Sequence, residues 1–513
     1  MAGPDGSGYR RDTDSGQSVI IRVIVVVRNA FRLAVLLLAA ALAGTVAAPA
    51  SAADRCARSA ALDVGANGGA LFSTVSPFEH FGSNRTQVFP HTCTLRQLTG
   101  TASPTVATRT SGADFSTPYI SATRRRGELY VYGYRRNPAT EGGFVAKVDP
   151  RTLEQEWRTP ILDPEPADGW TYPGVMAVHG NGYLYAVYAS VMVKLDPETG
   201  RTLARRELPE DPDGTGAAYN GLVILPDGRI VTKKIERGPC STPPGATASA
   251  AAIGGLFCSA ANGLPSKLVV LSPRNLRILS RTTPPEPITG RITAGRTDGT
   301  DYVYGAGSDS LFRFRYRRGD LRFDRGWGKV TYRTGAQEPG TGPGMLGRFA
   351  VVQTNFVSSD EPMTVTAVDT RDSSHVFRIR PFAHQDGSWI VSKAALDSAN
   401  STIVTHDTAA GKMAAIHLSP KRGLRVRWRR DLTSLAFSAL VGPPRSRQIV
   451  IPDASNGGDQ VVWLDEDDGT ERARSETLAP LPAPGNIVTP GFGGRFYYTS
   501  QGGTLWELRP EAP

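Results

Sequence analysis

Short runs of β-branched and aromatic residues recur along the chain, and a polar turn follows each of them. Residues 144–148 precede Asp149-Pro150, and residues 191–195 precede the turn Asp196-Pro197-Glu198-Thr199-Gly200. In such turns Asp or Ser accepts backbone N–H groups, Pro fixes its own φ and Gly supplies a left-handed position, so each run predicts a hairpin. Looser copies lie at residues 268–273, 311–316, 364–369, 413–420, 461–469 and 505–510.

A second hairpin lies upstream of most of these copies. Residues 222–225 and 229–232 flank the turn Pro226-Asp227-Gly228, and residues 175–178 and 183–187 flank Gly180-Asn181-Gly182. Residues 487–488 and 496–499 flank Gly493-Gly494 in the same way. The upstream hairpin supplies an inner pair of strands and the downstream hairpin an outer pair. Each repeat therefore predicts four antiparallel strands.

The repeats return about every 44 to 53 residues, which is the period of a β-propeller blade. We therefore expect an all-β fold, a single propeller of about eight four-stranded blades, with seven blades as the alternative. The last copy ends the chain before a fourth strand can form, so an N-terminal strand around residues 92–98 is expected to close the ring and cover its edge. The predicted division is residues 1–52 as a signal peptide or anchor, 53–116 as the segment with the closing strand, and 117–513 as the propeller.

The first fifty residues are typical of an export signal. Five arginines precede the apolar run 33–43, and Ala50-Ser51-Ala52 forms a small-residue cleavage site. A second apolar stretch, residues 19–27, leaves an uncleaved membrane anchor as the alternative. The chain is therefore expected to be secreted or held in the cell envelope.

Cysteine usage agrees with export. All four cysteines follow the cleavage site, and an even number in an exported chain favours two disulfides. Proximity pairs Cys56 with Cys93 and Cys240 with Cys258. The second pair would pin an insertion at residues 238–263, and closing that loop would contribute about 3 kcal/mol on the chain-entropy model. Zinc is disfavoured because the chain has no C-x-x-C pair.

The charge balance is basic but modest for the length. The net charge of +10 falls to about +8 without the first 52 residues. Basic clusters such as Arg124-Arg125-Arg126 and Arg313, Arg315, Arg317 and Arg318 can face an anionic partner, although the alternating arginines are also typical of the solvated face of a strand. No nucleic-acid motif is present, so we expect no nucleic-acid partner.

Two features resemble the repeat of the quinoprotein dehydrogenases and their cofactor-free relatives. Asp149 is followed eight residues later by Trp157, and residues 195–200 form an Asp-x-x-Thr-Gly turn. In that family such a turn precedes a docking Trp. The resemblance implies a propeller and, in active members, pyrroloquinoline quinone (PQQ), Ca²⁺, a stacking Trp and often a vicinal disulfide. Adjacent cysteines and a C-x-x-C-H haem motif are missing from this chain.

Polar and aromatic side chains near the starts of the inner strands are the candidate site residues, because propeller ligands usually sit there beside the central channel. They are Trp170, Tyr172, Tyr219, Asn220, Arg291, Arg348, Asn355 and Asn486. Each also has a structural interpretation, since aromatics pack between blades and Asn favours turns. An acidic loop with Asp453 and Asp459 offers a weak calcium site.

Three functions follow from these features. The first is a secreted or envelope-associated binding propeller that contacts a protein, glycan or envelope component through its channel face. The alternative is an oxidoreductase that uses a quinone cofactor or calcium in the channel. A weaker third possibility is a lactonase-like hydrolase with an acidic calcium cluster. Catalytic residues are not identified by any motif, and a membrane contact would require the N-terminal segment to stay uncleaved.

Overall fold

The computed structural model describes twelve stretches of the chain: residues 70–101, 103–111, 118–134, 142–162, 174–209, 218–235, 265–288, 290–356, 359–382, 387–480, 483–501 and 503–512. All of these stretches belong to one compact unit, which spans residues 52–513 and excludes residues 1–51. The predicted signal segment, residues 1–52, lies outside the described residues, as does the insertion at 238–263. Among the described helices, none is long and apolar enough to cross a membrane.

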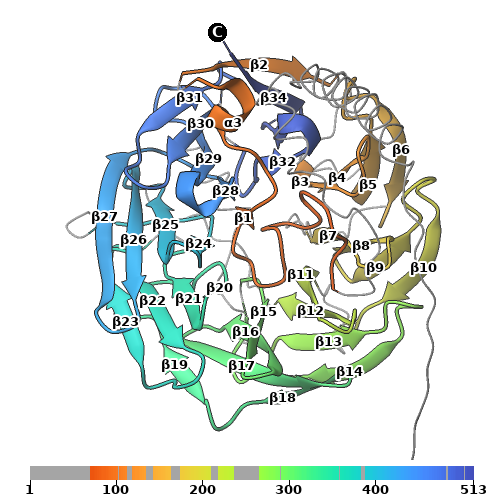
Figure 1. Ribbon diagram of the computed structural model, residues 1–513. Coiled ribbons are helices and arrows are strands. Elements are labelled where there is room, and N and C mark those ends of the chain that lie inside the picture. Colours follow the sequence, from red (N-terminus) through yellow and green to blue (C-terminus); the bar gives the residue numbers. More distant parts are fainter. Residues whose placement is uncertain are drawn as a thin grey trace, which may run out of the picture. The chain divides into compact units, whose positions relative to one another are not determined.

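Eight antiparallel sheets form the blades of a propeller (Figure 1). Blade 1 contains β3 (Pro118–Thr123), β4 (Leu129–Tyr134), β5 (Gly143–Val148) and β6 (Gln155–Pro160). Blade 2 contains β7 (Val175–Val178), β8 (Leu184–Tyr188), β9 (Val191–Leu195) and β10 (Thr202–Glu207). Blade 3 contains β11 (Ala218–Ile224), β12 (Ile230–Ile235), β13 (Lys267–Leu271) and β14 (Ile278–Thr282). Blade 4 contains β15 (Thr293–Thr297), β16 (Thr300–Ala306), β17 (Ser310–Arg317), β18 (Asp320–Phe323) and β19 (Lys329–Thr331).

The second half of the ring repeats this plan. Blade 5 contains β20 (Gly344–Leu346), β21 (Phe349–Gln353), β22 (Val365–Asp369) and β23 (Val376–Ile379). Blade 6 contains β24 (Ala395–Asp397), β25 (Thr402–Asp407), β26 (Lys412–Ser419) and β27 (Gly423–Asp431). Blade 7 contains β28 (Ala439–Val441), the 3-10 turn η1 (Pro444–Ser446), β29 (Gln448–Asp453), β30 (Gln460–Asp465) and β31 (Glu471–Arg474), with β1 (Val88–Phe89) added in parallel to β28. Blade 8 contains β32 (Thr489–Pro490), η2 (Phe492–Gly494), β33 (Phe496–Thr499), β34 (Leu505–Glu511) and β2 (Thr105–Thr110).

The order of strands confirms the predicted all-β fold and the count of eight blades. Every polar-turn repeat of the sequence supplies the third strand of a blade, and the upstream hairpins supply the first two. Because the strands alternate in direction, all inner strands begin on one face of the ring, here called the entry face, and end on the opposite face. The turns between first and second strands, and between third and fourth strands, lie on the opposite face.

Docking tryptophans join neighbouring blades. Gly200 has φ +72°, and a Cβ added to it would lie 2.6 Å from the Trp157 ring of the previous blade. Gly469 has φ +74°, and a Cβ added to it would lie 2.9 Å from the Trp428 ring of blade 6. The indole of Trp428 also donates to the Glu466 carbonyl at 2.8 Å. Glycine is therefore required at this turn position for two reasons: the backbone has a positive φ, and the Trp ring leaves no space for a Cβ.

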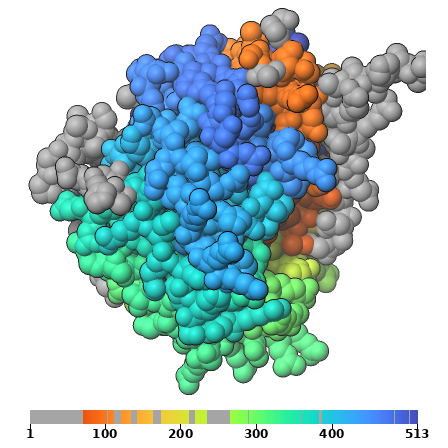
Figure 2. Space-filling view, turned by 60° about the vertical axis from the view of Figure 1, so that its left-hand side comes forward, coloured from red at the N-terminus to blue at the C-terminus, as the bar shows by residue number. Residues whose placement is uncertain are grey.

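The ring closes by an N-terminal strand, but not at the predicted residues. β2 pairs with β34 along its whole length, from Thr105 opposite Glu511 to Thr110 opposite Trp506. Residues 92–98, where the strand was expected, instead lead into helix α3 (Leu95–Thr99). Thr94 and Gln97 form a capping box there, which satisfies N-terminal N–H groups and favours the helix. Figure 2 shows the orange N-terminal part of the described chain beside the blue C-terminal blades.

The arginines of β17 differ from the predicted solvated face at one position. Arg313 is buried, its guanidinium lies 3.9 Å from the centre of the Tyr302 ring, and it pairs with Asp324 at 2.8 Å. Arg315 and Arg317 are exposed, as the alternation predicted. The fourth strand of blade 4 is interrupted between β18 and β19. The intervening turn places the Trp327 ring over the Arg313 guanidinium and covers it.

Cys93 is buried and disulfide-bonded. The other three cysteines lie outside the described residues, so both predicted pairings stay predictions.

Candidate functional site

The central channel contains a segment of the chain itself. Residues 70–89, here called the channel segment, run inside the ring before β1 joins blade 7 (Figure 1). Phe72, Phe78 and Phe89 of this segment are 1–2% exposed and pack in one hydrophobic cluster with inner strands. The space that a propeller often offers to a ligand is therefore occupied by protein in this chain.

Hydrogen bonds tie the channel segment to the innermost strand of all eight blades. Backbone carbonyls of Ser76, Pro77, Ser83, Asn84, Thr86 and Gln87 accept from the amides of Thr123, Val178, Ala294, Met345, Leu396 and Leu440, respectively. Blades 3 and 8 are reached through hydroxyls, because the amide of Ile224 donates to Ser83 Oγ and Ser76 Oγ donates to the Pro490 carbonyl. These bonds satisfy inner-strand groups that would otherwise face the channel without a backbone partner.

The backbone of the channel segment is strained. His80, Phe81, Arg85 and Gln87 all have φ between +52° and +70°. Each such residue costs about 1–2 kcal/mol relative to the right-handed region, and the conformation persists only where surrounding contacts over-determine it. The eight-blade attachment supplies those contacts.

A buried carboxylate lies among the cations of the channel. Glu79 pairs with Arg85 at 2.5 Å and with Arg291 at 2.9 Å, and all three side chains are at most 1% exposed. Arg85 also donates to the carbonyls of Ile292 and Leu222, at 2.6 and 3.0 Å. The three charges therefore link the channel segment to blades 3 and 4.

Two further titratable groups complete the cluster. Burial lowers the pKa of Lys393 well below its ordinary value, and the Arg85 cation adds to this. The Lys393 amine contacts the carbonyls of Arg85 and Ala394. Burial also lowers the pKa of His80, whose ring packs edge-on against Phe437 at 4.5 Å between centroids. The neutral forms of both groups are therefore favoured beside the two arginines.

The candidate residues taken from the sequence separate into three groups. Trp170 and Tyr172 lie outside the described residues, and Arg348 lies on the opposite face, exposed and paired with Asp369 at 2.8 Å. Five lie near the entry face and are buried: Tyr219, Asn220, Arg291, Asn355 and Asn486.

The five entry-face residues have internal partners. The Tyr219 hydroxyl donates to the Pro209 carbonyl, and Asn220 accepts from Lys233. Asn355 donates to the Glu361 carbonyl at 2.8 Å, and Asn486 donates to the Thr499 carbonyl at 2.7 Å. Gly221, which follows Asn220 in β11, lies beside Arg291, because a Cβ added to it would lie 3.5 Å from Arg291 Cδ. The structural interpretation therefore accounts for their positions.

The two acidic residues proposed for calcium have different partners. Asp453 accepts from Arg474 at 2.9 Å, and Asp459 accepts from the Tyr498 hydroxyl at 2.6 Å. Burial raises the pKa of Asp459 to about 7, which favours the protonated acid. Within the described part of the chain, no group of three or more His, Cys, Asp or Glu side chains has the arrangement to hold a metal ion.

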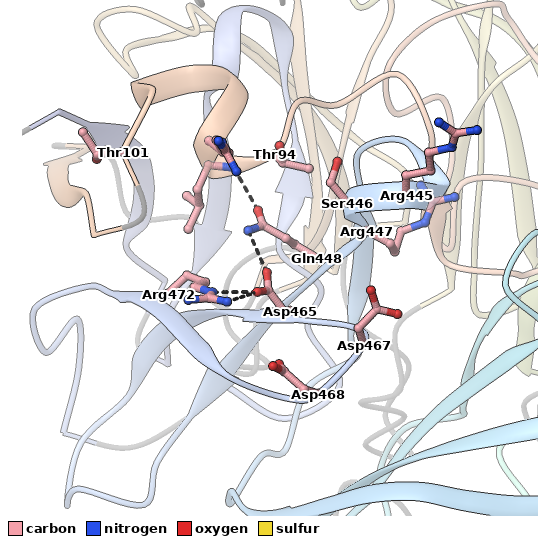
Figure 3. A pocket seen from close by; sticks show the side chains of 12 residues that line it. Thr94, Thr101, Arg445, Ser446, Arg447, Gln448, Asp465, Asp467, Asp468 and Arg472 are labelled. Carbon is pink, nitrogen blue, oxygen red and sulfur yellow. Dashed lines mark hydrogen bonds and ion pairs between the residues drawn. The ribbon is translucent and has the colours of Figure 1, made fainter.

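A pocket of about 420 Å³ opens on the opposite face of blade 7. Helix α3 forms one wall, and the turns around η1 and after β30 form the others (Figure 3). Its lining residues are Thr94, Leu95, Arg96, Thr101, Arg445, Ser446, Arg447, Gln448, Asp465, Asp467, Asp468 and Arg472. The sequence reasoning missed this pocket because its walls lie far apart in the chain. The one available signal was the capping box of Thr94 and Gln97, which predicts a helix near residue 95.

Gln448 connects the walls of the pocket. Its side-chain carbonyl accepts from the Leu95 amide at 2.8 Å, and its amide group donates to Asp465 at 3.3 Å (Figure 3). Arg472 pairs with the same Asp465 at 2.5 Å, and Arg447 pairs with Asp397 at 2.7 Å. These internal bonds fix the shape of the pocket and occupy two of its four arginines.

Comparison with solved structures supports the fold alone. The chain is similar to a europium-containing methanol dehydrogenase, with 8% identity, 85% of this chain and 90% of that chain covered, and a TM-score of 0.55. It is also similar to the quinohemoprotein alcohol dehydrogenase from Comamonas testosteroni, at 9% identity over 90% and 85% of the two chains, with a TM-score of 0.42. BamB from Moraxella catarrhalis shares 12% identity over 79% of this chain and 98% of that chain, with a TM-score of 0.46. No protein-family model matches the sequence, and no curated protein matches it.

Proposed function

We propose that the chain is a secreted or envelope-associated binding propeller that recognises a protein, glycan or envelope component on its entry face. The observation that supports this most is the channel segment, which is bonded to all eight blades where a propeller enzyme would place a ligand. A filled channel gives the ring a fixed shape and leaves the loops on its faces for recognition. The fold does not decide between the two functions, because binding propellers and quinone-dependent dehydrogenases share it.

The oxidoreductase alternative requires room for a planar quinone in the channel. The residues there do not fit this group. Glu79 is paired with both Arg85 and Arg291, and Arg85 also donates to the Ile292 and Leu222 carbonyls. Phe72 and Phe78 pack against the inner strands. A bound quinone would have to displace the channel segment from several blades. We therefore derive no reaction step through this cofactor.

Oriented immobilisation tests the proposed face. Asp360 lies in the turn between β21 and β22 on the entry face, and Asp372 lies in the turn between β22 and β23 on the opposite face; both are exposed. Single Asp360→Cys and Asp372→Cys variants of the mature chain would be biotinylated and attached to a surface. Envelope material from the producing cell is then expected to bind saturably to the Asp372→Cys surface, which leaves the entry face free, and soluble wild-type chain should compete. Equal binding in both orientations, or none in either, would overturn the proposal.

The alternative has its own test. A ligand that binds the native state raises the melting temperature. Because the channel segment leaves no room for a quinone, addition of PQQ and Ca²⁺ is expected to leave the melting temperature of the mature chain unchanged. A rise that saturates with quinone concentration would favour the oxidoreductase instead.

A further inference from the structure

Two arginines at the blade 7 pocket have no side-chain partner among the described residues. Arg96 of α3 and Arg445 of η1 both line the pocket and are exposed, whereas Arg447 and Arg472 have carboxylate partners. Guanidinium groups present paired N–H donors that match the oxygens of phosphate or carboxylate. We propose that this pocket binds a small doubly charged anion, a phosphate or a short dicarboxylate, with Arg96 and Arg445 as its cationic partners.

The pocket is built rather than incidental. Thr94, Arg447 and Gln448 are 1–5% exposed, so its floor consists of fixed polar side chains. A Cβ on Gly442 would lie 2.3 Å from Thr94 Cγ2, which shows how closely α3 is seated on blade 7. The volume of about 420 Å³ falls in the usual range for small-molecule sites and exceeds what a single phosphate needs. The size therefore admits an anion that carries a small organic group.

The acidic wall of the pocket sets where the anion binds. Asp467 pairs with Arg427 at 3.0 Å, and Asp468 accepts from the Thr470 amide at 2.8 Å. The Thr470 amide lowers the pKa of Asp468, so this carboxylate repels an anion, whose position is therefore expected on the side of Arg96 and Arg445. Removal of the Asp468 charge is therefore expected to increase the affinity of the pocket for an anion.

Calorimetric titration of the mature wild-type chain with inorganic phosphate, and separately with succinate, tests the site at low ionic strength. Arg96→Gln and Arg445→Gln are each expected to weaken binding about tenfold or more, because each removes a charge-assisted contact to the anion. The double variant should not bind detectably. Arg325→Gln is the matched control, since Arg325 is an exposed arginine of blade 4 remote in sequence and blade from the pocket.

Asp468→Asn distinguishes the sign of the ligand charge. Tighter binding of either anion by this variant supports the proposal. Weaker binding would assign the pocket to a cationic or zwitterionic ligand and overturn it. Binding by the double arginine variant at wild-type affinity, or no binding of either anion to the wild-type chain at millimolar concentration, would also overturn it. Melting temperatures of all variants show that each remains folded. The outcome is independent of the entry-face experiment, because the pocket lies on the opposite face.

Discussion

The channel and the blade 7 pocket both contain arginines and carboxylates, but the two regions differ in what surrounds the charges. In the channel, Glu79, Arg85 and Arg291 are at most 1% exposed. Glu79 pairs with both arginines, and Arg85 also donates to two backbone carbonyls. At the pocket, the side chains of Arg427 and Asp467 are 30% and 75% exposed, and Arg96 and Arg445 have no partner among the described residues. Buried charges must be satisfied internally, whereas exposed ones are free for ligands. The same residue types therefore hold the fold together in one region and are available for recognition in the other.

The largest expected effect is at the channel. Glu79→Gln keeps the shape of the side chain but removes the carboxylate between two buried arginines. Removing one partner of a buried ion pair typically destabilises by about 3–5 kcal/mol. Urea unfolding of the mature chain, followed by tryptophan fluorescence, should show this loss. A variant as stable as wild type would mean that the channel charges do not anchor the segment.

A buried and an exposed carboxylate of blade 7, Asp459 and Asp468, are expected to differ in their effect on the pH dependence of stability. Burial raises the pKa of Asp459 to about 7, whereas the exposed Asp468 has a pKa below its usual value because the Thr470 amide donates to it. The unfolded chain ionises Asp459 near 3.8, so the unfolded state is increasingly favoured as pH rises from about 4 to 7. Asp459→Asn is expected to flatten the dependence of unfolding free energy on pH in this window, by at most about 1.4 kcal/mol per pH unit. Asp468→Asn should leave the slope in this window unchanged, and equal slopes for Asp459→Asn and wild type would contradict the burial effect.

A pair of glycines separates helix docking from backbone strain. Gly442 has φ +85° and Gly457 has φ +79°, so alanine is strained at both. A Cβ at Gly442 meets Thr94 of α3 at 2.3 Å, whereas a Cβ at Gly457 has nothing within 4 Å. Gly457→Ala is therefore expected to lose about 1–2 kcal/mol and Gly442→Ala about 1–3 kcal/mol more. Gly442→Ala should also weaken anion binding at the pocket. Equal losses in unfolding experiments would mean that α3 is not seated against Gly442.

The smallest effect is expected at the exposed pair of Arg427 and Asp467. Asp467→Asn should change the unfolding free energy by less than about 1 kcal/mol, because exposed ion pairs contribute little in water. Urea unfolding at low and at high salt measures this directly. A loss as large as that of Glu79→Gln would remove the distinction between the two regions.

The repeat pattern of the sequence predicted the ring, and the reason is physical. Each polar turn, such as Asp196 accepting from the Glu198 and Thr199 amides at 2.9 and 3.1 Å, is determined by local chemistry. The predicted position of the closing strand, residues 92–98, is wrong because Thr94 and Gln97 form a capping box, which favours a helix there. β2 has the alternating β-branched residues that a strand favours.

The contents of the channel could not be predicted in the same way. Residues 70–89 have no repeat, and their conformation depends on eight strands that are distant in sequence. Arg291 is buried, and a buried charge near the channel needs a partner. The partner, Glu79, lies 212 residues away in the segment with no recognised pattern. For the same reason the pocket, which joins α3 to turns near residues 445 and 467, was not found from sequence.

Hydrogen exchange of the mature chain tests the central claim most directly. Peptides that cover residues 70–89 are expected to exchange as slowly as the inner strands, since the segment is bonded to every blade. The amides of Ala294, Met345, Leu396 and Leu440, which donate to the segment, should be protected to the same degree. Exchange of residues 70–89 within seconds, while the outer strands of the same blades stay protected, would show that the channel is open in solution and would contradict the account.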